Sequence, residues 1–356
     1  MSTRRVFAAG AVVLGLLAAA CGGGGGGPLA SGSPAASATA GGVLRLGYFP
    51  NLTHATAIVG VEKGLFADHL TAAGGTKLEM KTFNAGGDAV TALFGKSIDA
   101  SYIGPNPAIN AFQKSKGEAI RIISGATSGG AFLVVSKDIS GPDDLKGKKL
   151  ATPQLGNTQD VALRAWLKSK GLETDTSGGG DVQIVNQENS VSLETFRSGT
   201  IAGAWVPEPW ATRLVDEGGG KVLVDERDLW PHGRYVTTHL IVRTEYLTQH
   251  PEQVKALLEG DLEADAFIHD HENEAKAVVN AGIEKITTKA IATDVLDKAW
   301  DNLTFTPDPV AASLAKSKDD AVALGLLEAI DLDGIYDLAP LNALLKADGR
   351  EEVEGL

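Results

Sequence analysis

The chain has 356 residues, of which 43% are hydrophobic and 22% charged, as in ordinary globular proteins. Its formal net charge of −13 argues against nucleic-acid binding, because that function needs clustered Lys and Arg. Only one cysteine is present, so no disulfide forms within the chain and stability must come from core packing.

Residues 1–20 have the pattern of a secretory signal peptide. Arg4 and Arg5 precede an apolar run that ends in small residues directly before Cys21. The run is too short to span a bilayer as a helix. A cysteine after small residues resembles the bacterial lipobox, which implies lipidation of Cys21, although Ala18 stands where leucine is usual. An ordinary secretory peptide with an incidental cysteine is the alternative.

Residues 21–42 have the composition of a flexible linker. Glycine occupies positions 22–27, and the residues from 28 to 42 are Gly, Ala, Ser, Pro and Thr apart from Leu29. Such a segment behaves as a coil and cannot bury enough apolar area to fold. We therefore expect a lipidated stalk that holds a folded domain near a membrane surface.

From residue 43 onward, short β-type runs alternate with helical segments. Strands are predicted at 43–49, 78–83, 100–103, 120–124, 132–135, 149–152, 182–185, 201–205, 222–224 and 238–242. Helices are predicted at 56–66, 88–94, 105–114, 160–169, 192–197 and 210–217, and the chain is mainly helical after Pro251. This alternation favours βαβ units with parallel sheets. The expected fold class is α/β, with two lobes and a helical C-terminal segment.

The loops after the predicted strands are polar and contain the candidate ligand-binding residues. Ligands of open α/β sheets bind beyond the carboxyl ends of the strands. Gly, Pro, Asn, Thr or Ser at a helix start leaves backbone N–H groups available for a carboxylate, sulfonate, phosphate or nitrate. The candidates are Asn51, Thr53, His54, Asn106, Thr127, Ser128, Asn157, Thr158, Trp205, Glu208 and Trp210.

Several candidates also have a structural interpretation. His54 either donates to the ligand or caps a helix, and the tryptophans either stack on the ligand or belong to the core. Glu208 either hydrogen-bonds an amino or hydroxyl group or organises neighbouring turns. Because the loops contain no Arg or Lys, an anion would be held by neutral donors and helix ends. A zwitterion or neutral molecule stays an alternative.

Six segments carry a resemblance to a known family. They are GYFPN at 47–51, VEKGLF at 61–66, IDASYIGP at 98–105, PDDLKGKK at 142–149, PEPW at 207–210 and YLTQHPE at 246–252. In this order they resemble the substrate-binding proteins of ABC importers for nitrate, taurine and aliphatic sulfonates. The resemblance implies a type II periplasmic-binding-protein fold. Lobe one would comprise 43–135 and 239–356, lobe two 136–238, and the hinges would lie near 136–140 and 235–238.

The resemblance also implies a function. The chain would be a solute-binding lipoprotein on the outer face of the cytoplasmic membrane that captures a small oxyanion by lobe closure. An aliphatic sulfonate or taurine-like compound is the first candidate, delivered to an ABC permease and its ATPase. We expect a monomer with no enzymatic activity, no cofactor, no metal and no nucleic-acid partner. The alternatives are a same-fold binder of a neutral or cationic heterocycle, such as a pyrimidine or thiamine precursor, and an enzyme of related fold.

Overall fold

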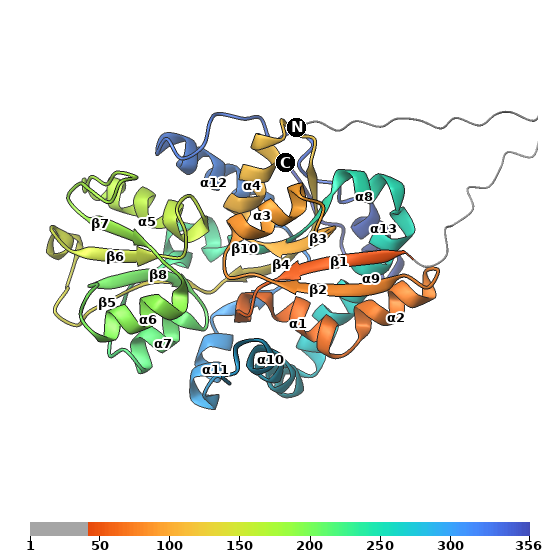
Figure 1. Cartoon of the computed structure of the whole chain (residues 1–356), viewed down its shortest axis with the longest axis horizontal. Helices are drawn as coiled ribbons and strands as arrows, with labels where there is room; N and C mark the ends of the chain where they lie inside the picture. The colour runs from red at the N-terminus through yellow and green to blue at the C-terminus, as the bar shows by residue number, and fades with distance from the viewer. Residues whose placement is uncertain (1–41) are drawn as a thin grey trace, which may run out of the picture. The chain divides into compact units, whose positions relative to one another are not determined.

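The structure is a computed structural model that describes residues 42–356 (Figure 1). The predicted signal peptide, the lipidation site Cys21 and the predicted linker as far as residue 41 lie outside the described residues. Between residues 42 and 356, no helix combines the length and the apolar character needed to cross a bilayer.

The first sheet contains six strands. Their spatial order is β11 (Leu303–Phe305), β4 (Ile120–Gly129), β10 (Val236–Arg243), β3 (Ala100–Ile103), β1 (Val43–Tyr48) and β2 (Lys77–Thr82). β1 runs parallel to β2 and β3, with Leu46 opposite Met80 on one side and Ala100 on the other. β10 is antiparallel to both β3 and β4, and β11 is antiparallel to β4.

The second sheet contains five strands. Their spatial order is β7 (Gln183–Asn186), β6 (Lys149–Thr152), β8 (Gly203–Pro207), β5 (Ala131–Val135) and β9 (Lys221–Asp225). β6 runs parallel to β7 and β8, whereas β5 is antiparallel to β8 and β9. Both sheets are therefore mixed and not purely parallel as the alternation predicted. The antiparallel members include β5 and β10, which directly follow the two passages of the chain between the sheets.

Helices cover both faces of the first sheet and form lobe one with it (Figure 1). One face packs against α1 (Ala55–Glu62), α2 (Leu65–Ala72), α9 (Pro251–Asp270), α10 (Glu272–Thr287), α11 (Thr293–Trp300) and α13 (Ala339–Ala347). The other packs against α3 (Gly86–Phe94), α4 (Pro105–Lys114) and α12 (Ala311–Ala323), and α8 (Thr244–Gln249) follows β10. The spacing of Val254, Leu258, Leu262 and Ala266 predicts one apolar stripe along a helix. The first three are buried along α9, whereas Ala266 is exposed.

One predicted helix is divided in two. The sequence predicts a single helix over 56–66, whereas α1 and α2 are separate. Gly64 lies between them with φ of +78°, a left-handed conformation that ends an α-helix and that glycine adopts at little cost. Phe66 of α2 then packs closely on Gly60, where a Cβ would lie 2.2 Å from the phenylalanine ring.

The second sheet and its helices form lobe two. α5 (Thr158–Ser169) covers one face, where its apolar residues pack with Trp205 of β8. α6 (Asn189–Arg197) and α7 (Trp210–Asp216) cover the other face. With two sheets, each covered by helices on both faces, the predicted α/β fold of two lobes is confirmed.

The chain passes between the two sheets twice. The first passage is at Gly130, between β4 and β5, and Gly129 and Gly130 have φ of +82° and +74°. The second precedes Val236, where β10 begins, after the 3-10 turns η3 (Glu226–Leu229) and η4 (Pro231–Gly233). The sequence interpretation placed the first boundary between the lobes after residue 135. Because β5 pairs with β8, β5 belongs to the second sheet, and the boundary lies before it.

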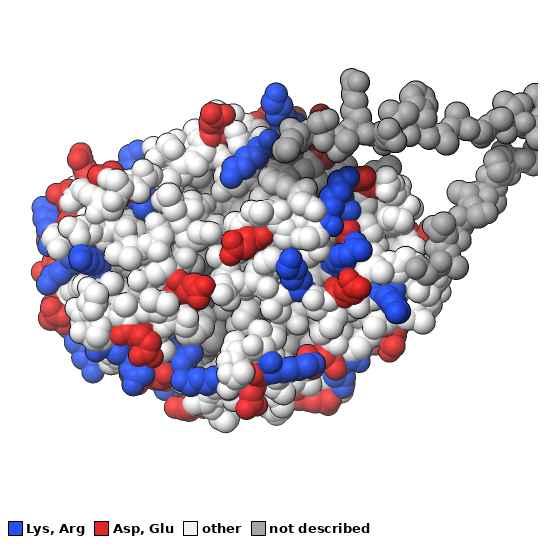
Figure 2. All heavy atoms as spheres, in the orientation of Figure 1, with Lys and Arg blue, Asp and Glu red and all other residues white. Residues whose placement is uncertain are grey.

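On the face shown in Figure 2, acidic and basic side chains are interspersed, and neither sign gathers into a single large patch. Among the described residues, exposed ion pairs also form within helices, such as Lys316 with Asp320. Exposed pairs of this kind contribute little to stability.

Candidate ligand-binding site

A cavity of about 50 Å³ lies between the two lobes. Its walls are formed by Phe49, Asn51, Thr53, His54, Asn84, Ala85, Gly86, Gly104, Pro107, Pro153, Asn157, Thr158, Gln159, Asn189, Pro207 and Thr237. A hollow of about 40 Å³ adjoins it and is lined by Phe49, Pro50, Asn51, Asn84, Glu188, Asn189, Ser190 and Trp210. A cavity needs about 10–15 Å³ to hold one water molecule. This cavity therefore has room for a group of roughly four non-hydrogen atoms, each about the size of a water.

A larger groove, of about 1130 Å³, lies elsewhere, between η4 and the C-terminal segment from Gly349 to Leu356. We place the candidate site in the smaller cavity because of its position in the fold. The segments that follow β1, β2, β3, β6 and β7 all contribute to its walls. Ligand sites of open α/β sheets occur at such strand ends.

Four helices begin at this cavity, two from each lobe. α3 and α4 start at Gly86 and Pro105, and α5 and α6 start at Thr158 and Asn189. None of the four N-cap residues makes a side-chain capping hydrogen bond. The backbone N of Gly87 in α3 donates instead to Gln154, and Pro105 and Pro107 in the first turn of α4 have no N–H, so α5 and α6 offer the most backbone donors. The positive ends of four helix dipoles therefore converge on one small space.

The described walls of the cavity contain no Lys, Arg, Asp or Glu. His54 is the one titratable side chain among the wall residues described, and burial lowers its pKa to about 3. Its Nδ1 lies 3.4 Å from the backbone N of Phe49, which donates to it. The neutral ring therefore carries its proton on Nε2, which makes His54 a hydrogen-bond donor without charge.

Hydrogen bonds join the two lobes around the cavity. Trp210 donates from Nε1 to Oδ1 of Asn51, at 2.9 Å. Asn84 donates from Nδ2 to Oε1 of Glu188, at 3.0 Å. A third bond runs from the backbone N of Gly87 to Gln154 of lobe two, at 2.9 Å. These contacts surround a polar, uncharged space suited to a small molecule that accepts several hydrogen bonds.

The structure brings together six of the eleven sequence-predicted residues. Asn51, Thr53, His54, Asn157 and Thr158 line the cavity, and Trp210 lines the adjoining hollow. All six come from the loops or first turns that follow β1, β6 and β8. Their placement agrees with the rule that ligands bind beyond strand ends.

Three other predicted residues lie in lobe one but outside the cavity walls. Asn106 is buried, and its Nδ2 donates to the backbone O of Ser317 in α12, at 3.2 Å. Thr127 donates from Oγ1 to the backbone O of Thr53, at 2.7 Å, and so supports the turn that carries His54. Ser128 lies within β4 because this strand continues to Gly129, well beyond the predicted end at 124.

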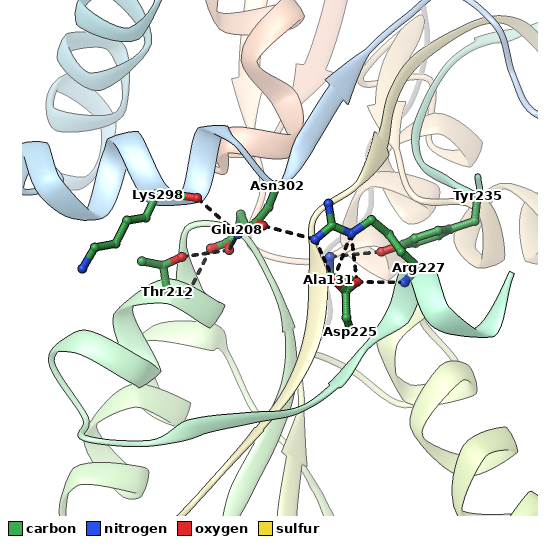
Figure 3. Close-up of polar contacts among 8 residues, drawn as sticks. All are labelled: Ala131, Glu208, Thr212, Asp225, Arg227, Tyr235, Lys298 and Asn302. Atoms are coloured by element: carbon green, nitrogen blue, oxygen red, sulfur yellow. Dashed lines mark hydrogen bonds and ion pairs between the residues drawn. The ribbon is translucent and has the colours of Figure 1, made fainter. Parts of the chain in front are cut away.

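Trp205 and Glu208 are also directed away from the cavity. Trp205 is fully buried in the core of lobe two and donates from Nε1 to Glu226, at 2.7 Å. The Glu208 carboxylate accepts hydrogen bonds from Thr212 in the first turn of α7 and from Asn302 of lobe one (Figure 3). Burial raises the pKa of Glu208 to about 7, although these hydrogen bonds oppose the rise.

The sequence interpretation missed four polar residues of the cavity: Asn84, Gln159, Asn189 and Thr237. Asn189 opens α6, is 8% exposed, and its Oδ1 has no hydrogen-bond partner among the described residues. An asparagine at a helix start was a usable signal, but α6 was predicted to begin at Ser192. Asn84 follows β2, whose end could have been examined like those of the other strands.

Comparison with known proteins finds binding proteins among those that this chain resembles. The profile of the NMT1-like family matches residues 40–281. The chain is 28% identical over 217 residues to the taurine-binding periplasmic protein of Escherichia coli (strain K12), which covers 59% of this chain and 65% of that protein. It therefore spans slightly less than two thirds of the length of that relative.

Solved structures share the architecture. The alkanesulfonate-binding protein SsuA from Xanthomonas axonopodis pv. citri, bound to MOPS, has a TM-score of 0.67 at 18% identity and covers 82% of this chain and 96% of its own. The periplasmic nitrate-binding protein NrtA from Synechocystis PCC 6803 has a TM-score of 0.73 at 18% identity, with coverages of 86% and 88%. The fold is thus that of periplasmic binding proteins, as the resemblance implied. Since the family profile matches more than half of the sequence, the chain belongs to the NMT1-like family.

Proposed function

We propose that this protein is an extracytoplasmic solute-binding lipoprotein that captures a small oxyanion between its lobes and delivers it to an ABC permease. Aliphatic sulfonates and taurine-like compounds are the first candidates for the ligand. The observation that carries the proposal is the convergence of four helix N-termini on an uncharged cavity between the lobes. Backbone N–H groups and helix ends supply partial positive charge to an anion without an ion pair.

The size of the cavity favours a compact headgroup. A space of about 50 Å³ suits a nitrate, a bicarbonate or the headgroup of a sulfonate better than a heterocycle. The tail of a short alkanesulfonate would extend into the adjoining hollow, where Phe49, Pro50 and Trp210 offer apolar surface. Glu188 lines the same hollow and is the acidic residue placed to meet the ammonium group of taurine.

Export and anchoring complete the proposal. Residues 1–20 would direct secretion, and lipid on Cys21 would hold the chain at the outer face of the cytoplasmic membrane through the linker at 21–42. The names of relatives support a binding role, since the E. coli relative is a taurine-binding periplasmic protein. The permease and its ATPase are the partners that such a role requires.

A thermal-shift panel tests the ligand class. We expect ethanesulfonate, taurine, nitrate or bicarbonate to raise the melting temperature of the full-length chain, because a ligand at about a hundred times its Kd stabilises by roughly 2.7 kcal/mol. Asn189→Leu, which fills the cavity with an apolar side chain, should abolish the shift. Val191→Leu is the matched control on the same helix, since Val191 is 44% exposed.

The same panel can reject the proposal. A clear shift with a pyrimidine or another neutral or cationic heterocycle, together with none from any of the four anions, would replace the oxyanion by that ligand class. An equal shift in Asn189→Leu would move the binding site out of the cavity. A larger shift with taurine than with ethanesulfonate would assign Glu188 a role in recognising the ammonium group.

A further inference from the structure

Glu208 forms a buried contact between the lobes, just before α7, and is not one of the cavity walls. Its carboxylate is 1% exposed and accepts hydrogen bonds from the backbone N and Oγ1 of Thr212, at 3.0 and 2.8 Å. The third donor comes from lobe one: Nδ2 of Asn302, in the segment between α11 and β11, lies 2.8 Å from Oε1 (Figure 3). One carboxylate therefore links the first turn of α7 to lobe one.

Asn302 is held in place from both lobes. Its Nδ2 also lies 3.2 Å from the backbone O of Lys298, within lobe one. Its Oδ1 accepts a hydrogen bond of 3.4 Å from Nη2 of Arg227, in lobe two. Arg227 is fixed in turn by Asp225, with contacts of 2.6 and 3.0 Å. We call Asn302, Glu208 and Arg227 the interlobe clasp.

The clasp lies beside the first passage between the sheets. Leu303, the residue after Asn302, pairs with Gly129. The backbone N of Glu208 donates to the O of Gly130, at 2.8 Å. Any rotation of lobe two about Gly129 and Gly130 would therefore move Glu208 and Arg227 relative to Asn302.

The clasp is also connected to the cavity through α7. Glu208 anchors the first turn of α7 through Thr212, and Trp210, the first residue of this helix, bonds Asn51 across the adjoining hollow. At the other end of α7, Asp216 forms an ion pair of 2.7 Å with Lys298 of α11. Contacts with lobe one thus hold both ends of α7.

We propose that the interlobe clasp positions α7 in the closed arrangement of the lobes and so raises ligand affinity from outside the cavity. Asn302, Glu208 and Arg227 are positioning residues here, because none of them lines the cavity. This inference rests on the proposed function, in which ligand binds tightly only to the closed arrangement, so its apparent Kd rises as the closed fraction falls. A hydrogen bond to a charged group is strong enough to change that fraction about tenfold.

Asn302→Ala is the direct test, with Asn280→Ala as its matched control. The Asn280 side chain makes two hydrogen bonds, with the backbone N and O of Ile291, and both lie within lobe one. The two substitutions therefore remove the same chemical group from the same lobe. Only the first removes a contact between the lobes.

Hydrogen–deuterium exchange of the full-length chain at pH 8 reports closure without any ligand. In Asn302→Ala we expect faster exchange in the cavity segments 84–90 and 187–192, one from each lobe, and an ethanesulfonate Kd about tenfold higher. In Asn280→Ala we expect faster exchange only near residues 280–291 and an unchanged Kd. Because the exchange measurement needs no ligand, its result is independent of whether ethanesulfonate binds.

Wild-type exchange of the cavity segments in Asn302→Ala would overturn the clasp, as would equally fast exchange there in Asn280→Ala. If Asn302→Ala does not fold, Arg227→Gln decides. The Arg227 side chain is 38% exposed and donates to Oδ1 of Asn302 from lobe two, so this variant should fold while losing a clasp contact. Faster exchange of the cavity segments in Arg227→Gln supports the proposal, and wild-type exchange overturns it.

Discussion

His54 contributes to the cavity as a neutral donor. Its ring is 3% exposed, and burial lowers its pKa to about 3, far below the usual 6.5. The backbone N of Phe49 donates a hydrogen bond to Nδ1, so the ring proton is on Nε2. A histidine with an ordinary pKa would become cationic near pH 6 and would attract an anion more strongly as the pH falls. His54 stays neutral across that range.

The pH dependence of binding tests this state of His54. We expect His54→Gln, which keeps an uncharged donor, to differ from wild type in its Kd for ethanesulfonate by the same factor at pH 5.5 and pH 7.5. Taking the ratio of the two proteins cancels the titration of Glu208, which both retain. Isothermal titration calorimetry measures both constants. If the advantage of wild type grows about tenfold at pH 5.5, His54 is cationic there and the interpretation is wrong.

Among the elements, the passage between β4 and β5 depends on two consecutive glycines. Gly130 has φ of +74°, and a Cβ there would lie 2.2 Å from Cδ2 of Leu303. Gly129 has φ of +82°, with the O of Asn302 at 2.9 Å from such a Cβ. A side chain at either position would collide with the segment that carries the clasp.

Gly130→Ala should therefore destabilise the protein by more than the strain of a left-handed alanine alone. Gly171→Ala is the control, because Gly171 has the same φ of +74° but open space around its Cβ. We expect about 1 kcal/mol for the control from left-handed strain, and at least twice that for Gly130→Ala. Urea unfolding gives both values. Equal losses would show that Leu303 moves aside without cost.

The elements were largely predictable from sequence, whereas the passages between sheets were not. Strand and helix periodicity placed β1, β3, α4 and β6 within a residue of their observed bounds. Local pattern does not encode sheet membership, so β5 was assigned to lobe one although it pairs with β8. Glu208 was a candidate for the cavity, with the organisation of neighbouring turns as its alternative, and its bonds to Thr212 match the alternative. Its loop was located correctly, but the direction of its side chain depends on Asn302, 94 residues later in the chain.

At the scale of the whole molecule, the sequence divides into an N-terminal segment predicted to reach the membrane and a domain for which we propose solute binding. The single cysteine precedes residue 42, so the described domain contains no thiol and no disulfide. Four apolar clusters, two in each lobe, form the core that stabilises this domain. Removal of the anchor should therefore leave the domain folded and able to bind.

Cys21→Ser tests this separation. We expect the variant to be lost from the detergent phase in a two-phase partition of expressing cells, while its thermal shift with ethanesulfonate equals that of wild type. Gly22→Ser is the neighbouring control, since it changes a small residue and keeps the thiol. Partition of Cys21→Ser like that of wild type would refute the lipid anchor and favour the ordinary secretory peptide.

The uncharged wall of the cavity also has a consequence for unloading of the cargo. Attraction between two full charges decays only as the inverse of their distance, so an arginine would retain its anion while the lobes separate. The attraction of helix ends is confined to about the first turn. An anion meets only helix ends and neutral donors at the described walls. A small separation of the lobes therefore removes most of the attraction between the walls and the anion. Under the proposed function, the movement of the lobes itself releases the cargo to the transporter, and no counter-charge has to be supplied to displace it.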